Sequence, residues 1–196
     1  PAGDFVVRNF IDEIVGREWQ KLGLVPVEAC GDGEFLRRAS LDLTGTLPTL
    51  EEVRAFLASN DPQKRSKLID DLLERAEYVD YWSLKWSDLL RVHRRYVGEK
   101  GLESFSGWVR RAVRENKPLD VMTRELLTAQ GNLYTSGPVA YYIVDQKPEE
   151  LAETTAQLFL GVRMQCTKCH HHPFEVWSQD DYYGLAAFFT KLETKE

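Results

Sequence analysis

Two of the chain's three cysteines and three of its four histidines fall within MQCTKCHHHPFEVW, residues 164–177. Cys166, Cys169 and His170 form the pattern C-x-x-C-H, which is typical of c-type haem attachment. In such a site the two thiols add across the vinyl groups of the porphyrin, and the histidine that follows binds the iron. On a helical turn, residues 166, 169 and 170 share one face. The pattern therefore predicts one haem c, with thioethers at Cys166 and Cys169 and with His170 as the proximal iron ligand.

Two other uses of these residues stay open. A structural zinc site at Cys166, Cys169, His170 and His172 would satisfy the preference of Zn²⁺ for sulfur and nitrogen, although no second ligand pair follows a dozen or more residues away. A redox-active dithiol is less favoured, because the C-x-x-C of thioredoxin-like proteins opens a helix in a βαβ setting and no strand pattern precedes it here. Cys30 lies far away in the sequence, so a disulfide framework is not expected.

Apolar and aromatic residues follow the cysteines and are candidates for the wall of a haem pocket. We assign pocket roles to Phe174 and Trp177, and expect His172 to bond a haem propionate or a backbone carbonyl. Further candidates for the wall are Tyr182, Tyr183, Phe188 and Phe189.

The opposite face of the iron has no obvious ligand in the sequence. Met164, His171 and His172 lie too close to the attachment motif to reach that face. Met122 lies on the apolar phase of its predicted helix, where core packing is expected. His93 is surrounded by arginines in RVHRRY and is expected to be solvated or to cap a helix. We therefore predict an iron without a strong distal side-chain ligand.

Composition excludes several other classes of protein. The chain has 196 residues, of which 43% are hydrophobic and 29% charged, enough for a packed apolar core. Its formal charge of -6 argues against nucleic-acid binding, which depends on Lys and Arg neutralising phosphates. No apolar run approaches the roughly 20 residues that span a bilayer, and PAGDFVV does not resemble a signal peptide. We expect any export signal or anchor to lie outside these residues.

Hydrophobic periodicity predicts helices along almost the whole chain and no strand. Thr49 with Glu52 forms a capping-box pattern, and Pro62 and Pro148 suit first helical positions. We predict an all-α fold in one compact domain over 1–196, with a haem attachment segment over 161–190 and one long irregular loop at about 130–147. The expected helices cover 4–22, about 35–44, 49–58, 62–76, 78–96, 103–115, 119–128, 148 to about 165, and 178–192.

Three stretches carry a family resemblance: FLRRASLDLTGTLPTLEEVRAFL, YWSLKWSDLLR and FLGVRMQCTKCHHHPFEVWSQDDYYGLAAFF. Together they resemble the second type of planctomycete cytochrome c domain, over about residues 4–190. The resemblance implies covalent haem inside large multidomain proteins that are exported from the cytoplasm, in the periplasm or at the cell surface. The chain departs from the family pattern at His171, where the family has an acidic residue.

These observations together predict a c-type cytochrome domain that transfers electrons within or between extracytoplasmic proteins. Its partner would be a redox protein or a neighbouring domain, and the chain suits an electron carrier better than a stand-alone enzyme. The alternative is a helical interaction domain whose cysteine and histidine cluster holds zinc or nothing. An absorption spectrum separates the two hypotheses.

Overall fold

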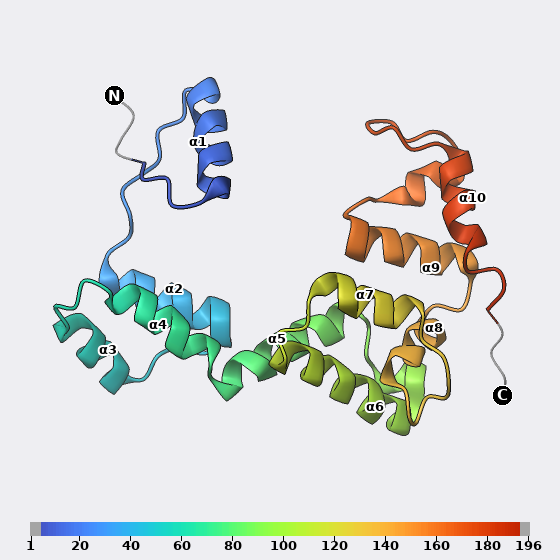
Figure 1. The fold of residues 1–196 in the computed structure, drawn as a ribbon, viewed down its shortest axis with the longest axis horizontal. Helices are drawn as coiled ribbons and strands as arrows, with labels where there is room; N and C mark the ends of the chain where they lie inside the picture. Colours follow the sequence, from blue (N-terminus) through green and yellow to red (C-terminus); the bar gives the residue numbers. More distant parts are fainter. Residues whose placement is uncertain (1–4, 193–196) are drawn as a thin grey trace. The chain divides into compact units, whose positions relative to one another are not determined.

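A computed structural model describes residues 5–192 of the chain, and the all-α prediction is confirmed there: these residues form helices and no strand (Figure 1). The α-helices are α1 (Phe10–Leu22), α2 (Asp32–Thr44), α3 (Leu50–Ala58), α4 (Lys64–Leu73), α5 (Ala76–Leu89), α6 (Arg94–Arg114), α7 (Leu119–Leu127), α8 (Tyr141–Val144), α9 (Pro148–Thr155) and α10 (Gln179–Ala187). Two 3-10 helices, η1 (Gly137–Ala140) and η3 (Met164–Lys168), and a π-helix, η2 (Ala156–Leu160), complete the set.

The chain divides into two compact units. Unit 1 comprises residues 1–42 and 46–70, and unit 2 comprises residues 43–45 and 71–196. The prediction of a single domain stays a prediction, because two compact units can form one domain or two. The whole attachment segment lies in unit 2.

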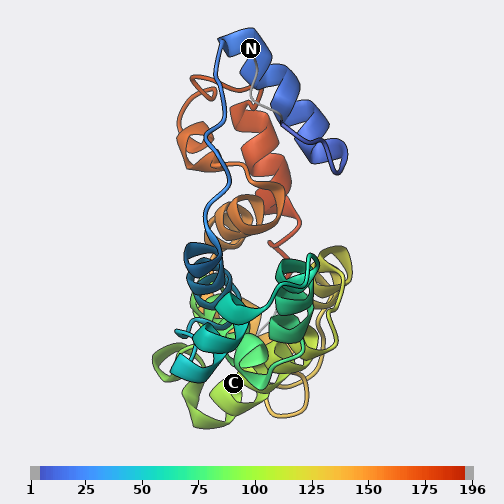
Figure 2. The same ribbon diagram turned by 90° about the vertical axis from the view of Figure 1, so that its left-hand side faces the viewer.

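Unit 1 contains α1 and α3, together with most of α2 and α4 (Figure 2). Asp32 at the start of α2 forms ion pairs with Lys64 and Arg65 of α4, at 2.6 and 2.7 Å. Hydrogen bonds from these two cations hold the pKa of the Asp32 carboxyl below its usual value. The rings of Phe35 and Phe56 stack beside these cations, with centroids 6.4 Å apart. The α2, α3 and α4 helices are thus joined by one charged cluster and one aromatic pair.

Helix α3 begins at its predicted cap, whereas α1 does not. The Thr49 hydroxyl accepts from the Glu52 N–H, and the Glu52 carboxylate accepts from the Thr49 N–H, which completes the predicted capping box of α3. Helix α1 begins later than predicted because Asn9 caps it, with its side chain accepting from the N–H groups of Ile11 and Asp12. Residue 4 of the predicted 4–22 helix lies outside the described residues.

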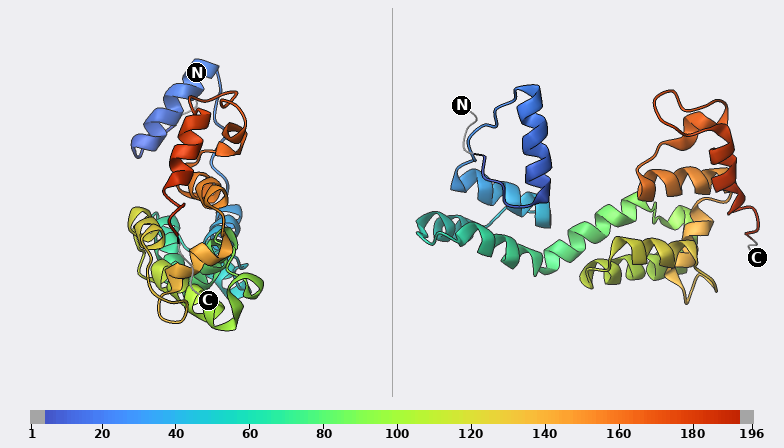
Figure 3. Two further views of the ribbon diagram at one scale, coloured as in Figure 1. Left: turned by 90° about the vertical axis from the view of Figure 1, so that its right-hand side faces the viewer. Right: turned by 45° about the horizontal axis from the view of Figure 1, so that its top comes forward.

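The core of unit 2 forms around α6, which packs on α5 and on η1. Phe105, Trp108 and Val109 of α6 are buried in it, together with Met122 and Leu126 of α7. Helix α10 packs on α9 and on η3, the turn that carries the first cysteine (Figure 3). The cysteine-bearing turn therefore rests on two helices of unit 2.

Part of the predicted 130–147 loop is helical. Residues 137–140 form η1 and Tyr141–Val144 form α8, leaving about 130–136 and 145–147 as irregular connections. Pro138 has the backbone angle that suits a first helical turn. Burial of Ala140, Tyr141 and Tyr142 then holds the two short helices against α6. Tertiary packing, which periodicity in so short a segment does not reveal, explains the difference.

Gly137 allows this close packing, and Gly137→Ala is expected to destabilise the protein. A Cβ atom there would lie 2.5 Å from the backbone oxygen of Ser104 and 2.8 Å from Cβ of Trp108. Since a backbone carbonyl cannot rotate away, η1 must shift from α6, at a cost of about 1–3 kcal/mol in the free energy of unfolding. Urea denaturation measures this change. An unchanged midpoint of the urea transition would show that η1 does not pack this closely on α6.

Tyr141 is expected to make the free energy of unfolding fall at alkaline pH. Burial raises the pKa of its phenol from 10.0 to about 12, although a 2.8 Å hydrogen bond with Thr155 opposes this. The unfolded chain ionises this phenol near pH 10, so the stabilisation is complete below that pH and is lost as the pH rises to about 12. Tyr141→Phe should therefore flatten the fall in unfolding free energy between these pH values. Identical pH profiles for both proteins would contradict this.

No helix within residues 5–192 is both long enough and apolar enough to span a membrane.

Candidate functional site

The 3-10 turn η3 sorts the motif residues into a buried row and an exposed row. A 3-10 helix has three residues per turn, so residues i and i+3 lie above one another. Met164 and Thr167 are buried, and the Thr167 hydroxyl donates to the Met164 carbonyl at 2.6 Å. Cys166 in η3 and Cys169 just after it, also in helical backbone conformation, are exposed. Both thiols are free, and the three-residue repeat directs them toward the same side of the turn.

This arrangement differs from the predicted long helix, which was expected to run from Pro148 toward Cys166. Helix α9 passes into the π-helix η2 and ends at Gly161, whose φ of 68° lies in the left-handed region. Glycine adopts that conformation without steric cost. The motif therefore lies on a separate 3-10 turn. Residues three apart share one side of this turn, whereas the prediction placed the motif residues on one face of an α-helix.

His170 is exposed, and a backbone contact selects its tautomer. Its Nδ1 atom lies 2.6 Å from the carbonyl oxygen of His171. A carbonyl oxygen only accepts, so Nδ1 carries the proton and Nε2 keeps its lone pair. Iron- and zinc-binding histidines commonly have this arrangement, in which one nitrogen donates to a carbonyl and the other binds the metal. The ring nitrogen that C-x-x-C-H assigns to iron is thus free to bind it.

His172 has the opposite tautomer and shapes the loop that follows. Its Nδ1 atom accepts from the N–H groups of Phe174 and Glu175, at 3.3 and 3.0 Å. The backbone N–H of His172 donates to the Trp177 carbonyl at 2.9 Å, which closes the loop of residues 172–177. In the neutral ring Nε2 therefore carries the proton and can only donate. The predicted bond to a propionate remains a prediction, and Nε2 is the atom that could make it.

The closed loop holds two apolar side chains out in solvent. Phe174 and Val176 are each 92% exposed, although burial of such side chains is favourable. The two free thiols and the Nε2 atom of His170 form a donor set that would suit a covalently bound porphyrin. The apolar surface of the loop offers a contact area for its ring.

Helix α10 supports the turn between the two cysteines. Gln179 Nε2 donates to the carbonyl oxygen of Lys168 at 2.9 Å, and the Tyr183 hydroxyl donates to the same oxygen at 3.4 Å. Sequence reasoning did not assign this role to either residue. Their spacing of four residues, which places them on one face of a helix, is the signal that could have identified them.

Tyr182 anchors the turn from beneath. Its side chain is fully buried beside Met164 and Ala156, and its hydroxyl donates to Glu153 of α9 at 2.7 Å. Burial and the Glu153 carboxylate both keep the pKa of this phenol well above its usual value. Tyr182 thus stays a neutral donor that joins α10 to α9 below the cysteines.

The structure does not gather the predicted aromatic residues into one pocket wall. Tyr182 and Phe189 belong to the buried core, whereas Phe174 and Phe188 are exposed. Trp177 is half-buried, and its indole N–H donates to Glu175 at 2.9 Å. The pocket roles of Phe174 and Trp177 stay predictions, and Tyr182 and Phe189 have structural roles instead.

The two remote candidates for a distal ligand have other roles. Met122 is buried in the main core of unit 2, as its helical phase indicated. His93 caps α6, and its Nδ1 accepts from the Arg95 N–H at 3.1 Å. The prediction that neither is a strong iron ligand remains untested.

The zinc alternative has no assembled ligand set. Across residues 5–192, no three His, Cys, Asp or Glu side chains are grouped so that they could hold a metal ion. Zinc at Cys166, Cys169, His170 and His172 would therefore require these side chains to move.

The fold and site define an all-α protein with an exposed C-x-x-C-H turn. A model of the PSCyt2 family, described as a protein of unknown function (DUF1549), matches residues 10–194, and the chain belongs to this family. This agrees with the family resemblance found in the sequence. No curated protein matches the chain, and neither does any solved structure.

Proposed function

We propose that the chain is a c-type cytochrome domain that carries one covalent haem and transfers electrons outside the cytoplasm. The single observation that carries the proposal is the C-x-x-C-H turn with both thiols free, exposed and on one side. When bound, haem supplies a one-electron couple whose potential depends on axial ligation, burial and hydrogen bonding.

The chain's own residues then have distinct tasks. Cys166 and Cys169 would supply the sulfur atoms of the thioethers, and Nε2 of His170 would hold the iron while Nδ1 donates to the His171 carbonyl. That bond fixes the ring orientation and raises the basicity of the ligand. The exposed side chains of Phe174 and Val176 support the proposal, because they offer apolar surface that a porphyrin face would cover.

The openness of the turn suits electron transfer to a neighbouring domain or a redox protein. Residues 166 and 169–171 are exposed, so a partner could approach the cofactor edge closely. The acidic overall charge of -6 favours partners with a basic docking face.

The test is an absorption spectrum of protein produced with and without the cytochrome c maturation machinery. We expect a Soret band, and α and β bands on reduction, only with the machinery. A colourless protein that contains zinc by elemental analysis would favour the zinc alternative, provided that a known c-type cytochrome matures in the same cells.

A further inference from the structure

A small cavity in unit 2 contains none of the attachment residues. It lies between α5, the end of α6 and the start of α7, and has a volume of about 130 Å³. An engineered cavity of about 150 Å³ binds one benzene molecule, so this cavity is of the size of a single six-membered ring. Its lining residues are Tyr78, Trp82, Trp86, Ala112, Val113, Asn116, Lys117, Leu119 and Met122.

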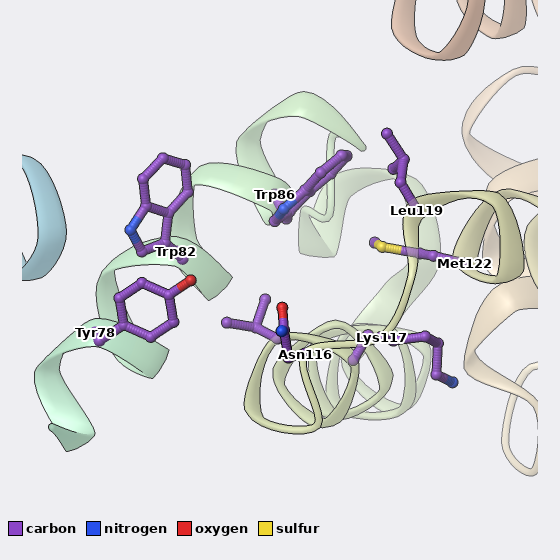
Figure 4. A pocket seen from close by; sticks show the side chains of 9 residues that line it. Tyr78, Trp82, Trp86, Asn116, Lys117, Leu119 and Met122 are labelled. Atoms are coloured by element: carbon purple, nitrogen blue, oxygen red, sulfur yellow. The ribbon is translucent and has the colours of Figure 1, made fainter. Parts of the chain in front are cut away.

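Aromatic rings from one helix form one side of the cavity. Tyr78, Trp82 and Trp86 recur every fourth residue and therefore lie along one face of α5. All three are only half-buried. Figure 4 shows them facing Leu119 and Met122 across the cavity. Such surfaces suit the faces of a planar ring.

Three polar groups converge on the same space. Figure 4 shows the Tyr78 hydroxyl, the indole nitrogen of Trp86 and the Asn116 carboxamide directed into it. Among residues 5–192, none of these side-chain groups has a hydrogen-bond partner. An indole N–H only donates, so a ligand that satisfies Trp86 must offer an acceptor.

Asn116 occupies a position where glycine is the usual residue. Its φ of 45° is left-handed, and the Lys117 N–H bonds the Ala112 carbonyl at 2.9 Å, as in a helix C-terminal cap. Asparagine tolerates this conformation and adds a carboxamide at the mouth of the cavity.

The ligand should carry no charge. Lys117 is the one charged residue of the lining, and its ammonium bonds both carboxylate oxygens of Glu125, at 2.8 and 2.7 Å. Figure 4 shows this side chain directed away from the cavity. No unpaired charge therefore remains there to attract an ion.

We propose that this cavity binds an uncharged six-membered ring that bears a carbonyl oxygen, the chemical class that includes pyridones and benzoquinones. Trp86 donates to the carbonyl, the Asn116 carboxamide and the Tyr78 hydroxyl provide further hydrogen bonds, and Trp82 and Met122 pack on the ring. The proposal is independent of haem attachment.

The test is a titration of the ¹⁵N-labelled chain with N-methyl-2-pyridone, which does not alkylate thiols. The five tryptophans give separate indole N–H resonances, so each acts as a reporter. We expect a saturable downfield shift of the Trp86 resonance and no shift for Trp19 of α1. Benzene, which lacks the acceptor, should bind more weakly and cause no downfield shift.

Two variants each remove one polar group from the lining of the cavity. Trp86→Phe keeps a ring but removes the N–H, and Asn116→Gly keeps the left-handed backbone but removes the carboxamide. Each should weaken pyridone binding roughly three- to tenfold, the effect of one hydrogen bond. Trp19→Phe is the matched control and should leave the affinity unchanged. Equal affinities for benzene and the pyridone, or no shift of the Trp86 resonance up to the solubility limit of the probe, would overturn the proposal.

Discussion

Alanine at either Cys166 or Cys169 is expected to leave haem held by one thioether or to abolish its attachment. Each substitution removes one of the two sulfur atoms that can add to a vinyl group, and both thiols are exposed, so neither contributes to the core. The double variant should carry no covalent haem. The pyridine haemochrome spectrum reports the change, because the position of its α-band depends on how many vinyl groups have reacted.

Cys30→Ala is the control for the cysteine variants. Cys30 lies in unit 1, and its contact with Arg65 uses its backbone carbonyl, which alanine retains. This variant should have the same spectrum, and the same mass of covalently bound haem, as the wild-type chain. If Cys166→Ala and Cys169→Ala also had that spectrum and mass, the assignment of the thioethers would be wrong.

Arg91→Gly is expected to destabilise unit 2 strongly, because it removes the partner of a buried carboxylate. Arg91 pairs with Asp145, which is only 5% exposed and also accepts from the Thr154 hydroxyl at 2.7 Å. Removing the guanidinium leaves a buried carboxylate without its counter-charge, which costs about 3 kcal/mol for a partly exposed partner. Glycine adopts the φ of 53° at this position more easily than arginine, so the measured loss of stability is a lower bound on the contribution of the ion pair.

Chemical denaturation of Arg91→Gly should give a lower midpoint with an unchanged slope. Adding Asp145→Asn should recover part of the loss, since it removes the uncompensated charge. Lys147→Ala breaks the exposed pair with Glu150 and should cost less than about 1 kcal/mol. Equal effects of Arg91→Gly and Lys147→Ala would show that the Arg91–Asp145 pair is no stronger than a surface pair.

Local signals in the sequence predicted most helices, because their caps act within a few residues. Thr49 with Glu52 and Ser178 with Asp181 form capping boxes where the sequence placed helix starts. One error was local, since Asn9 caps α1 later than predicted, whereas other errors arose where distant contacts decide the structure. Gly137 permits η1 to pack on α6, and the end of η2 at Gly161 separates α9 from the motif. Neither contact is encoded in local periodicity.

The candidate site shows the same division between local and distant information. The spacing of Cys166, Cys169 and His170 predicts the reactive atoms, because that spacing is itself the chemical requirement for haem attachment, and the assignment stays a prediction. The surroundings were less predictable, since an aromatic residue in α10 can point to the core or to solvent. Tyr182 is buried and Tyr183 is half exposed, although they are adjacent. Only the tertiary structure shows that Gln179 and Tyr183 bond the turn between the cysteines.

The most direct test of the central claim is the intact mass, under denaturing conditions, of the chain matured in cells that attach haem c. We expect a covalent mass increase of one haem, which maps to the peptide that contains Cys166 and Cys169. An unmodified mass, obtained while a co-produced control cytochrome is fully loaded, would contradict it.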